Sequence, residues 1–322
     1  MLLLLHASSW NLFKKNPLSK QIEAPQMSLA VSRCIFILIF IPVSLFAKYN
    51  VSMCTIFQND APFLREWIEF HKMQGIEHFY MYNNDSSDDY LAMLQPYMDK
   101  GVITLVQWPY DYNEGDVVAW KDIQTGAYMD CIAKYGKDSR WIAFIDSDEF
   151  LFCPSGKKLH AFLRRYKNHA AVCANWLMFG TSDVEVIPED CLMIELLTHC
   201  SHPSNSVNSH VKSIVQPKFV VGCPNPHYFY YKEGFYAVGS DLAPIPGAFS
   251  QIINHDKIRI NHYWTRTNRY FHEFKIPSRH KRRREKEDSL EKAAEAFNQA
   301  TDDRILRFVP ALRKRMKLRS RS

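Results

Sequence analysis

The chain has 322 residues, of which 47% are hydrophobic and 23% are charged, and this composition excludes an intrinsically disordered protein. Its formal net charge is +6, but residues 281–322 alone hold 14 Lys and Arg against 7 Asp and Glu, so the rest of the chain is close to neutral and a nucleic-acid-binding body is excluded. The eight cysteines stand singly, which excludes the paired spacing of a structural zinc site.

An uncharged apolar segment, CIFILIFIPVSLFA, occupies residues 34–47. It is shorter than the roughly 20 residues of a membrane span and matches the apolar region of a signal peptide. An uncleaved signal-anchor and a buried hairpin or helix are the alternatives. We predict that residues 1–50 are a leader and that the protein is membrane-associated, on a side that the sequence does not define. If the segment is not a targeting signal, we expect a cytoplasmic protein.

Short apolar runs alternate with helical stretches from residue 51 onward. We expect four strands followed by two later ones, at 51–57, 76–82, 102–108, 141–145, 170–179 and 258–264. Helices are expected between them at 62–74, 91–98 and 119–135, and a charged helical segment is expected after residue 268. Strand–helix repetition at this spacing predicts an α/β fold with a parallel sheet and right-handed crossovers.

Polar clusters follow three of the predicted strands. The sequences are NDAP at 59–62, NNDSSDD at 83–89 and DSDE at 146–149. Since ligands of parallel α/β sheets bind at the carboxyl ends of the strands, these clusters predict a binding site at that edge.

The stretch WIAFIDSDEFLF at 141–152 places three carboxylates between buried apolar residues. Carboxylates removed from water are costly unless a cation pairs with them. Asp146 and Asp148 are two residues apart, so at a strand end their side chains can converge on Mn²⁺ or Mg²⁺, which prefer carboxylate oxygens. Such an ion would neutralise the diphosphate of a departing nucleotide. An acidic turn that simply enters solvent is the alternative.

Four blocks in order resemble glycosyltransferase family 92, over about residues 51–280. The blocks are CTIFQNDAPFLREWIEFHKMQGIEHFYMYNNDSSDD, DSDEF, NWLMFGTS and INHYWTR. The resemblance implies a GT-A fold: a mostly parallel, twisted sheet flanked by helices, in a single nucleotide-sugar-binding domain with an acceptor-side half. It also implies inverting transfer of a hexose, often galactose from UDP-galactose, with Mn²⁺.

The resemblance assigns site residues by position. Asp146 and Asp148 match the metal-binding DxD motif, and His262 of the late HY block would be the third metal ligand. A strand-end histidine packed on its aromatic neighbours is the alternative for His262. Gln58 departs from the family, where a lysine is usual. The expected donor-binding residues are Asn59, Asp60, Asn83, Asp85, Ser147, Lys275 and Arg279; Trp176, Phe179 and Gly180 match a block near the acceptor side.

For several residues the sequence is compatible with either a chemical or a purely structural role. Lys275 and Arg279, four residues apart, either clamp the diphosphate or form an ordinary charged helix face. Inversion requires a general base, for which Asp183 is the first candidate, followed by Glu185 and Glu273. Lys212 is expected to be a solvated strand lysine.

The sequence thus predicts a metal-dependent hexosyltransferase that uses a UDP-sugar and a carbohydrate or other hydroxyl acceptor, with residues 51–280 as its catalytic domain. Residues 281–322 are expected to form a basic helical tail that is solvated or contacts a membrane. A non-catalytic carbohydrate-binding or scaffold protein with the same fold is the alternative.

Overall fold

A computed structural model describes residues 47–110 and 120–319. These residues belong to one compact unit. The predicted leader lies almost entirely outside the described residues. Within them, none of the helices has the length and apolarity needed to cross a bilayer.

A single ten-stranded sheet forms the centre of this unit. Its main path runs in the order β12-β11-β6-β8-β4-β1-β2-β3, and β13 pairs with both β6 and β5. The strands are β1 Tyr49–Phe57, β2 His78–Asn83, β3 Ile103–Gln107, β4 Ser139–Phe144, β5 Glu149–Phe152, β6 Ala171–Met178, β8 Val211–Val215, β11 Ala237–Val238, β12 Pro244–Ile245 and β13 Arg259–His262. Two small sheets pair β9 Val220–Asn225 with β10 Tyr228–Tyr231, and β7 His199–Cys200 with β14 Ala300–Thr301.

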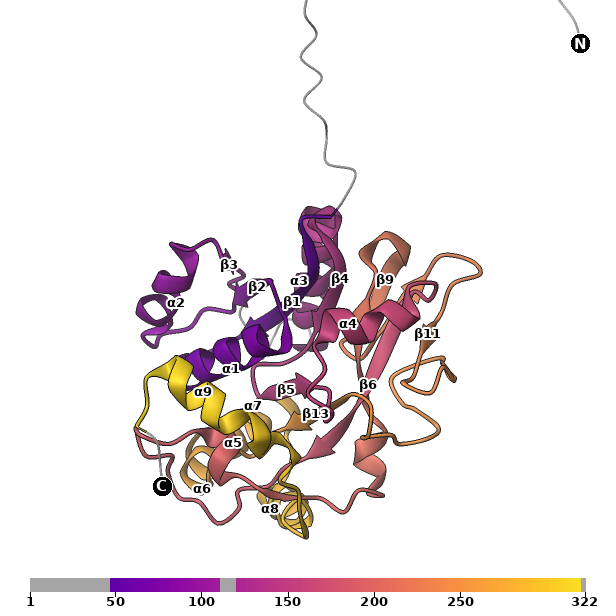
Figure 1. The fold of residues 1–322 in the computed structure, drawn as a ribbon. Coiled ribbons are helices and arrows are strands. Elements are labelled where there is room, and N and C mark those ends of the chain that lie inside the picture. The colour runs from indigo at the N-terminus through magenta and orange to yellow at the C-terminus, as the bar shows by residue number, and fades with distance from the viewer. Residues whose placement is uncertain (1–46, 111–119, 320–322) are drawn as a thin grey trace, which may run out of the picture. The chain divides into compact units, whose positions relative to one another are not determined.

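Most neighbours in the sheet are parallel. β1 runs parallel to β2 and β4, β2 to β3, and β6 to β11 and β13. Helices flank the sheet (Figure 1); they are α1 Ala61–Gln74, α2 Tyr90–Met98, α3 Trp120–Tyr135, α4 Leu159–Leu163, α5 Met193–Leu196, α6 Asn268–Tyr270, α7 Ile276–Arg283, α8 Glu287–Ala296 and α9 Val309–Met316. The predicted α/β fold with a mostly parallel sheet is confirmed.

Successive side chains of β1 enter two different cores. Val51, Met53 and Phe57 belong to a cluster that includes α1, whereas Cys54 and Ile56 belong to a cluster that includes α3. This follows from the two-residue period of a strand covered on both faces. The helices therefore hold β1 and its neighbours rigid, and fix the loops at their carboxyl ends.

The strand β5 was not predicted. The acids of 146–149 interrupt the apolar pattern, yet Glu149–Phe152 pairs antiparallel with β13, with Glu149 opposite His262. A backbone hydrogen bond from Tyr263 N to Asp148 O, at 2.9 Å, continues this ladder. The late HY block is therefore fixed beside the acidic turn by backbone pairing.

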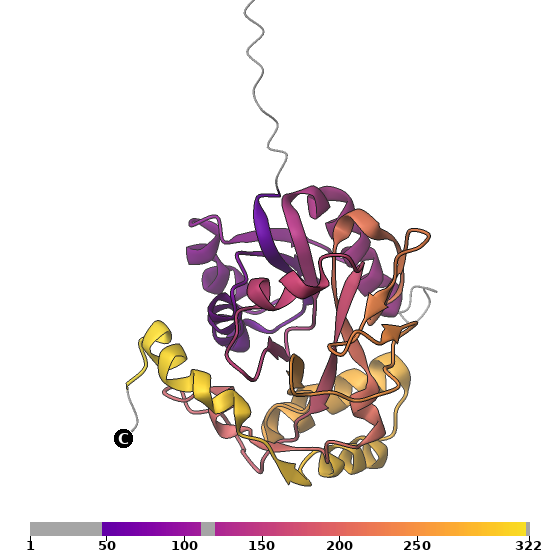
Figure 2. The same cartoon turned by 45° about the vertical axis from the view of Figure 1, so that its right-hand side comes forward.

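The basic C-terminal segment is helical, as expected, but its helix α9 packs on the body of the protein instead of being fully solvated. α9 lies alongside α1, far from it in sequence (Figure 1), and Leu312 is fully buried. Arg315 pairs with Glu69 at 2.8 Å, and Arg313 pairs with Glu195 at 2.6 Å. The basic residues of this segment thus neutralise acids of the body. With the chain start of β1 at the top, α7 and α8 gather at the lower end of the sheet (Figure 2).

The C-terminal segment also supplies a buried ion pair that we expect to govern acid stability. Asp302 bonds the fully buried Arg259 and, at 2.8 Å, Arg304. Burial opposes ionisation, but these two guanidinium groups outweigh it and lower the pKa of Asp302 to about 2 from 3.8. Its contribution is therefore present above about pH 4 and disappears as the pH falls towards 2.

Asp302→Asn is expected to cost about 3 kcal/mol in the free energy of unfolding at pH 7, because the Arg259 cation loses its carboxylate. Urea denaturation at pH 7 and pH 2.5 checks this, and the difference from wild type should shrink at the lower pH. Asp303→Asn, at the exposed neighbour, is the matched control. A pH-independent difference would contradict the assignment.

Candidate functional site

A cavity of about 630 Å³ opens at the carboxyl ends of β1 and β4, where the sequence places its polar clusters. Its floor includes Asn59, Asp60 and the acidic turn Asp146–Asp148, and β13 contributes His262. The C-terminal segment lines it with residues of the π-helix Phe271–Lys275, α7 and α8. The described residues therefore form a cavity at the edge of the sheet where the sequence predicts the site.

Asp146 is held by an internal lysine. Its Oδ1 accepts hydrogen bonds from Lys212 Nζ at 2.7 Å and from Gln124 Nε2 at 2.6 Å, and the Tyr128 hydroxyl lies at 3.4 Å. Burial favours the protonated acid, but the Lys212 charge outweighs it, so the pKa of Asp146 lies below its ordinary value. Lys212 is only 1% exposed. The expectation of a solvated lysine is wrong, because β8 lies between β4 and β6 in the sheet interior.

Asp148 contacts two cavity residues, His262 and Lys275. His262 Nε2 lies 3.3 Å from Asp148 Oδ1, and Lys275 Nζ lies 3.2 Å from Asp148 Oδ2. Burial opposes ionisation here too, but Lys275 and then His262 outweigh it and hold the pKa of Asp148 well below its usual range. Asp148 is therefore an anionic carboxylate next to an imidazole nitrogen.

Glu149 lies beneath this pair and is fully buried. Its Oε2 accepts the Asp146 backbone N–H at 2.8 Å, while its Oε1 faces Lys212 at 3.7 Å and His262 Nδ1 at 3.9 Å. Neither Glu149 Oε1 nor His262 Nδ1 has a hydrogen-bond partner among the described residues. Burial raises the pKa of Glu149 well above its ordinary value.

A further buried ion pair joins the loop after β1 to the loop after β13. Arg266, 1% exposed, pairs with Asp60 at 2.6 Å, and its guanidinium stacks on Phe63 at 3.9 Å and on Tyr270 at 4.5 Å. Ser147 also donates its hydroxyl to Asp60. Asp60 and Ser147 therefore line the cavity, but their side chains are already hydrogen-bonded to each other. Sequence reasoning missed Arg266, although the quoted INHYWTR block contains it.

The predicted donor residues separate into two groups. Asn59, Lys275 and Arg279 line the cavity. Asn83 and Asp85 do not: Asn83 is 3% exposed and donates to Gln107 at 2.7 Å, and Asp85 is exposed at the loop surface. Because Asn83 is the last residue of β2 and its side chain fixes the following loop, the structure gives it a structural position rather than a donor-contacting one.

The predicted general bases are not at the cavity. Asp183 is exposed, in a left-handed conformation with φ of 57°, and Glu185 is exposed beyond it. Glu273 points to solvent, with 55% of its side chain exposed, and pairs with Arg269 at 3.3 Å. Their positions do not support them as bases. The carboxylates that do line the cavity are Asp60, Asp146, Asp148 and Glu285.

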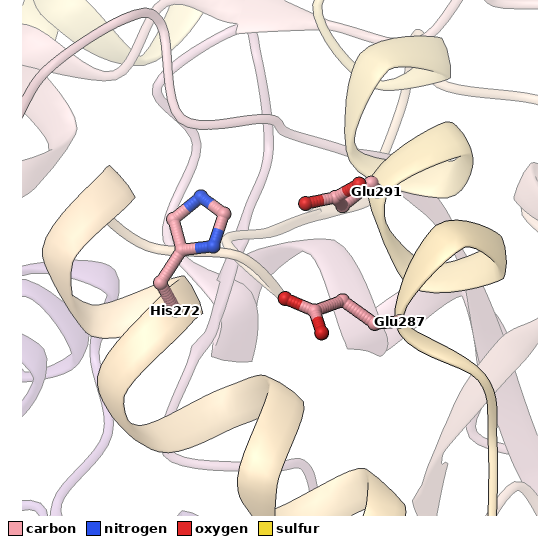
Figure 3. Close-up of side chains that lie close together, drawn as sticks. All are labelled: His272, Glu287 and Glu291. Carbon is pink, nitrogen blue, oxygen red and sulfur yellow. The ribbon is translucent and has the colours of Figure 1, made fainter.

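Among the described residues, the one group of three ligating side chains with all ligand atoms within 4.8 Å is His272, Glu287 and Glu291 (Figure 3). It lies outside the cavity lining, and two of its members are exposed. The predicted trio of Asp146, Asp148 and His262 is not such a group, and Asp146 Oδ1 lies 2.7 Å from Lys212 Nζ. Asp148 and His262 remain as an adjacent carboxylate and imidazole, which suits Mn²⁺ or Mg²⁺ that keeps water and phosphate ligands.

Comparisons with known proteins agree with the blocks quoted above. The model of the family described as glycosyltransferase family 92 matches residues 47–300. A family 92 protein of Oryza sativa subsp. japonica is 28% identical over 226 residues, 66% of this chain and 34% of that protein. A beta-1,4-galactosyltransferase of Caenorhabditis elegans, galt-1, is 32% identical over 108 residues, 32% of this chain and 25% of that protein.

The chain spans about a third of the length of the first curated relatives that it matches. Among solved structures, Staphylococcus aureus TarS in complex with UDP is 14% identical, with a TM-score of 0.33 over 52% of this chain and 47% of that chain.

Proposed function

The chain belongs to glycosyltransferase family 92, and from that membership and the cavity we propose that it transfers a hexose from a UDP-sugar to a hydroxyl group of a glycan, with inversion. Galactose is the first sugar to test, because one relative is named a galactosyltransferase. The observation that carries the proposal is the contact of Asp148 and His262 at 3.3 Å on the cavity wall.

Asp148 and His262 would hold a Mn²⁺ or Mg²⁺ ion, which supplies positive charge to balance a departing diphosphate. Lys275 and Arg279 line the same cavity and offer N–H donors to phosphate oxygens. Lys212 fixes Asp146, and the β5–β13 pairing fixes Glu149 opposite His262. These residues are ordered by buried contacts, which is the preorganisation that a charge-stabilising site requires.

In the proposed reaction the acceptor oxygen bonds to the anomeric carbon while the bond from that carbon to the diphosphate oxygen breaks. UDP leaves with the electron pair of that bond, and the hydroxyl proton passes to a carboxylate. We assign this base to Glu285, which lines the cavity from the segment between α7 and α8, with 29% of its side chain exposed. The other lining carboxylates are held by the buried cations Lys212, Lys275 and Arg266, whereas Glu285 pairs with the partly exposed Arg279 at 3.0 Å.

A donor screen tests the proposed function. The purified chain is incubated with UDP-galactose, UDP-glucose or UDP-N-acetylglucosamine, with and without Mn²⁺, and released UDP is measured with a panel of glycan acceptors. We expect acceptor-stimulated, Mn²⁺-dependent release with one donor. Binding of glycans without any release of UDP, for every donor, would instead indicate a non-catalytic carbohydrate-binding protein.

Glu285→Gln is expected to lower the turnover number by about 100-fold, because the amide cannot accept the acceptor proton. Binding of UDP with Mn²⁺ should survive, since Glu285 is not a proposed ligand. Glu273→Gln and Asp183→Asn are matched controls at exposed carboxylates outside the cavity, and both should turn over at the wild-type rate. Full activity of Glu285→Gln would move the base elsewhere.

A further inference from the structure

We propose that Lys275 exchanges partners during turnover: it competes with the divalent cation for Asp148, and it passes to the diphosphate when cation and nucleotide bind together. The inference rests on the proposed function and concerns the same site. Its consequence is that neither Mn²⁺ alone nor UDP alone binds well, whereas each promotes the binding of the other.

The competition follows from the way Asp148 is shared. One carboxylate oxygen faces His262 at 3.3 Å and the other faces Lys275 at 3.2 Å. A divalent cation that bonds Asp148 therefore approaches an ammonium group that already occupies the second oxygen. Two cations on one carboxylate repel strongly where water is largely excluded, and here the side chains of Asp148 and Lys275 are only 12% and 17% exposed.

The other cavity cations each have a carboxylate that a metal ion bound at Asp148 leaves in place. Arg266 pairs with Asp60 at 2.6 Å, Lys212 with Asp146 at 2.7 Å, and Arg279 with Glu285 at 3.0 Å. Lys275 depends on Asp148, the same carboxylate that the metal ion would use. Metal binding at Asp148 would thus leave Lys275 as a positive charge without its carboxylate partner.

Neighbouring cations make an unpaired positive charge on Lys275 energetically unfavourable. Arg266 and Arg279 both act on it as like charges. Lys275 and Arg279 also lie over the same indole ring, 5.3 and 5.5 Å from the centre of Trp264. A diphosphate, which carries several negative oxygens, provides the counter-charge that this positive cluster then lacks.

Lys275 lies where a π-helical turn passes into the helix α7. It is the last residue of the π-helix Phe271–Lys275, which separates α6 from α7. π-helical turns are rare and are frequently found at functional sites. The side chain that ends this turn both lines the cavity and reaches Asp148, so it can serve the acidic turn and a phosphate in the same cavity.

The exchange predicts opposite signs for two affinities in one variant. In Lys275→Met we expect Mn²⁺ alone to bind about tenfold more tightly, because its competitor is removed. In the same variant, UDP at saturating Mn²⁺ should bind about tenfold more weakly, because a charged phosphate donor is lost. The coupling between the two ligands, which is reciprocal by linkage, therefore shrinks in both directions.

The experiment measures free Mn²⁺ by electron paramagnetic resonance and UDP by calorimetry. Both are done in a His272→Ala background, which removes the exposed His272, Glu287 and Glu291 group as a second Mn²⁺ site. Lys275→Arg, which keeps the charge, should restore the wild-type affinity for Mn²⁺. Lys137→Met, at an exposed lysine outside the cavity, is the matched control, and the unfolding midpoint of each variant confirms that it is folded.

The outcomes separate the two proposals. Weaker or unchanged Mn²⁺ binding in a folded Lys275→Met protein overturns the exchange, while wild-type binding of UDP with Mn²⁺ still supports the transferase site. A wild-type protein that binds UDP equally well with and without Mn²⁺ overturns both the metal dependence and the exchange. Tighter Mn²⁺ binding together with weaker UDP binding supports the exchange.

Discussion

Asp148→Asn is expected to abolish the joint stabilisation of the protein by Mn²⁺ and UDP. Asp148 is the carboxylate that lies beside His262 in the cavity, and a neutral amide loses the charge that attracts the cation. At a hundredfold excess of ligand over its dissociation constant, wild type should gain about 2.7 kcal/mol in the free energy of unfolding. The variant should gain almost none, and its transferase rate should fall by at least about 100-fold.

Thermal unfolding with Mn²⁺, with UDP and with both ligands measures this effect. His272→Ala is the matched control, because it removes the exposed histidine of the other group with metal-ligand spacing and leaves the cavity intact. It should respond to Mn²⁺ and UDP as wild type does. A full response in Asp148→Asn, or its loss in His272→Ala, would place the cation outside the acidic turn.

Lys212→Met is expected to lower the free energy of unfolding by about 3–5 kcal/mol, the typical cost of breaking a buried ion pair from one side. The substitution leaves Asp146 without its lysine partner at 2.7 Å, and it leaves the fully buried Glu149 without the ammonium group at 3.7 Å. Methionine preserves most of the side-chain volume, so the loss reports charge rather than packing. Urea denaturation at pH 7 measures it.

A double-mutant cycle separates this charge effect from a general disturbance of β8. Asp146→Asn combined with Lys212→Met removes both members of the pair and should be clearly more stable than the sum of the two single losses implies. Strict additivity, or a cost below about 1 kcal/mol for Lys212→Met, would mean that the lysine behaves as the solvated residue that its sequence context suggested.

Local pattern was sufficient for the elements that form the cavity edge. The start signal at Pro62 placed α1 within one residue of its observed start, and the stop signal at Gly75 ends the helix with φ of 95°. The polar clusters after β1 and β4 were correctly assigned to the carboxyl end of the sheet because that rule depends only on strand direction.

Strand pairings and contacts between residues far apart in the chain could not be predicted from the sequence. Lys212 meets Asp146 across 66 residues because β8 enters the sheet antiparallel beside β4, and no motif near Lys212 reveals that pairing. Arg266 meets Asp60 across 206 residues because it follows β13, which pairs with β5 directly after the acidic turn. The direction of a loop side chain could not be predicted either: Asp183 has a φ of 57° and is exposed, and Glu273 is 55% exposed.

The position of β8 also limits where the chain can be cut into fragments that fold. β8 is inserted between β4 and β6, so the counter-charge for the acidic turn arrives from a later part of the chain than the turn itself. A fragment that ends after β5 would expose Asp146 and Glu149 without Lys212, and it would leave one edge of β4 unpaired. The first half should therefore not fold autonomously during synthesis, and truncations or domain exchanges should keep residues 47–319 together.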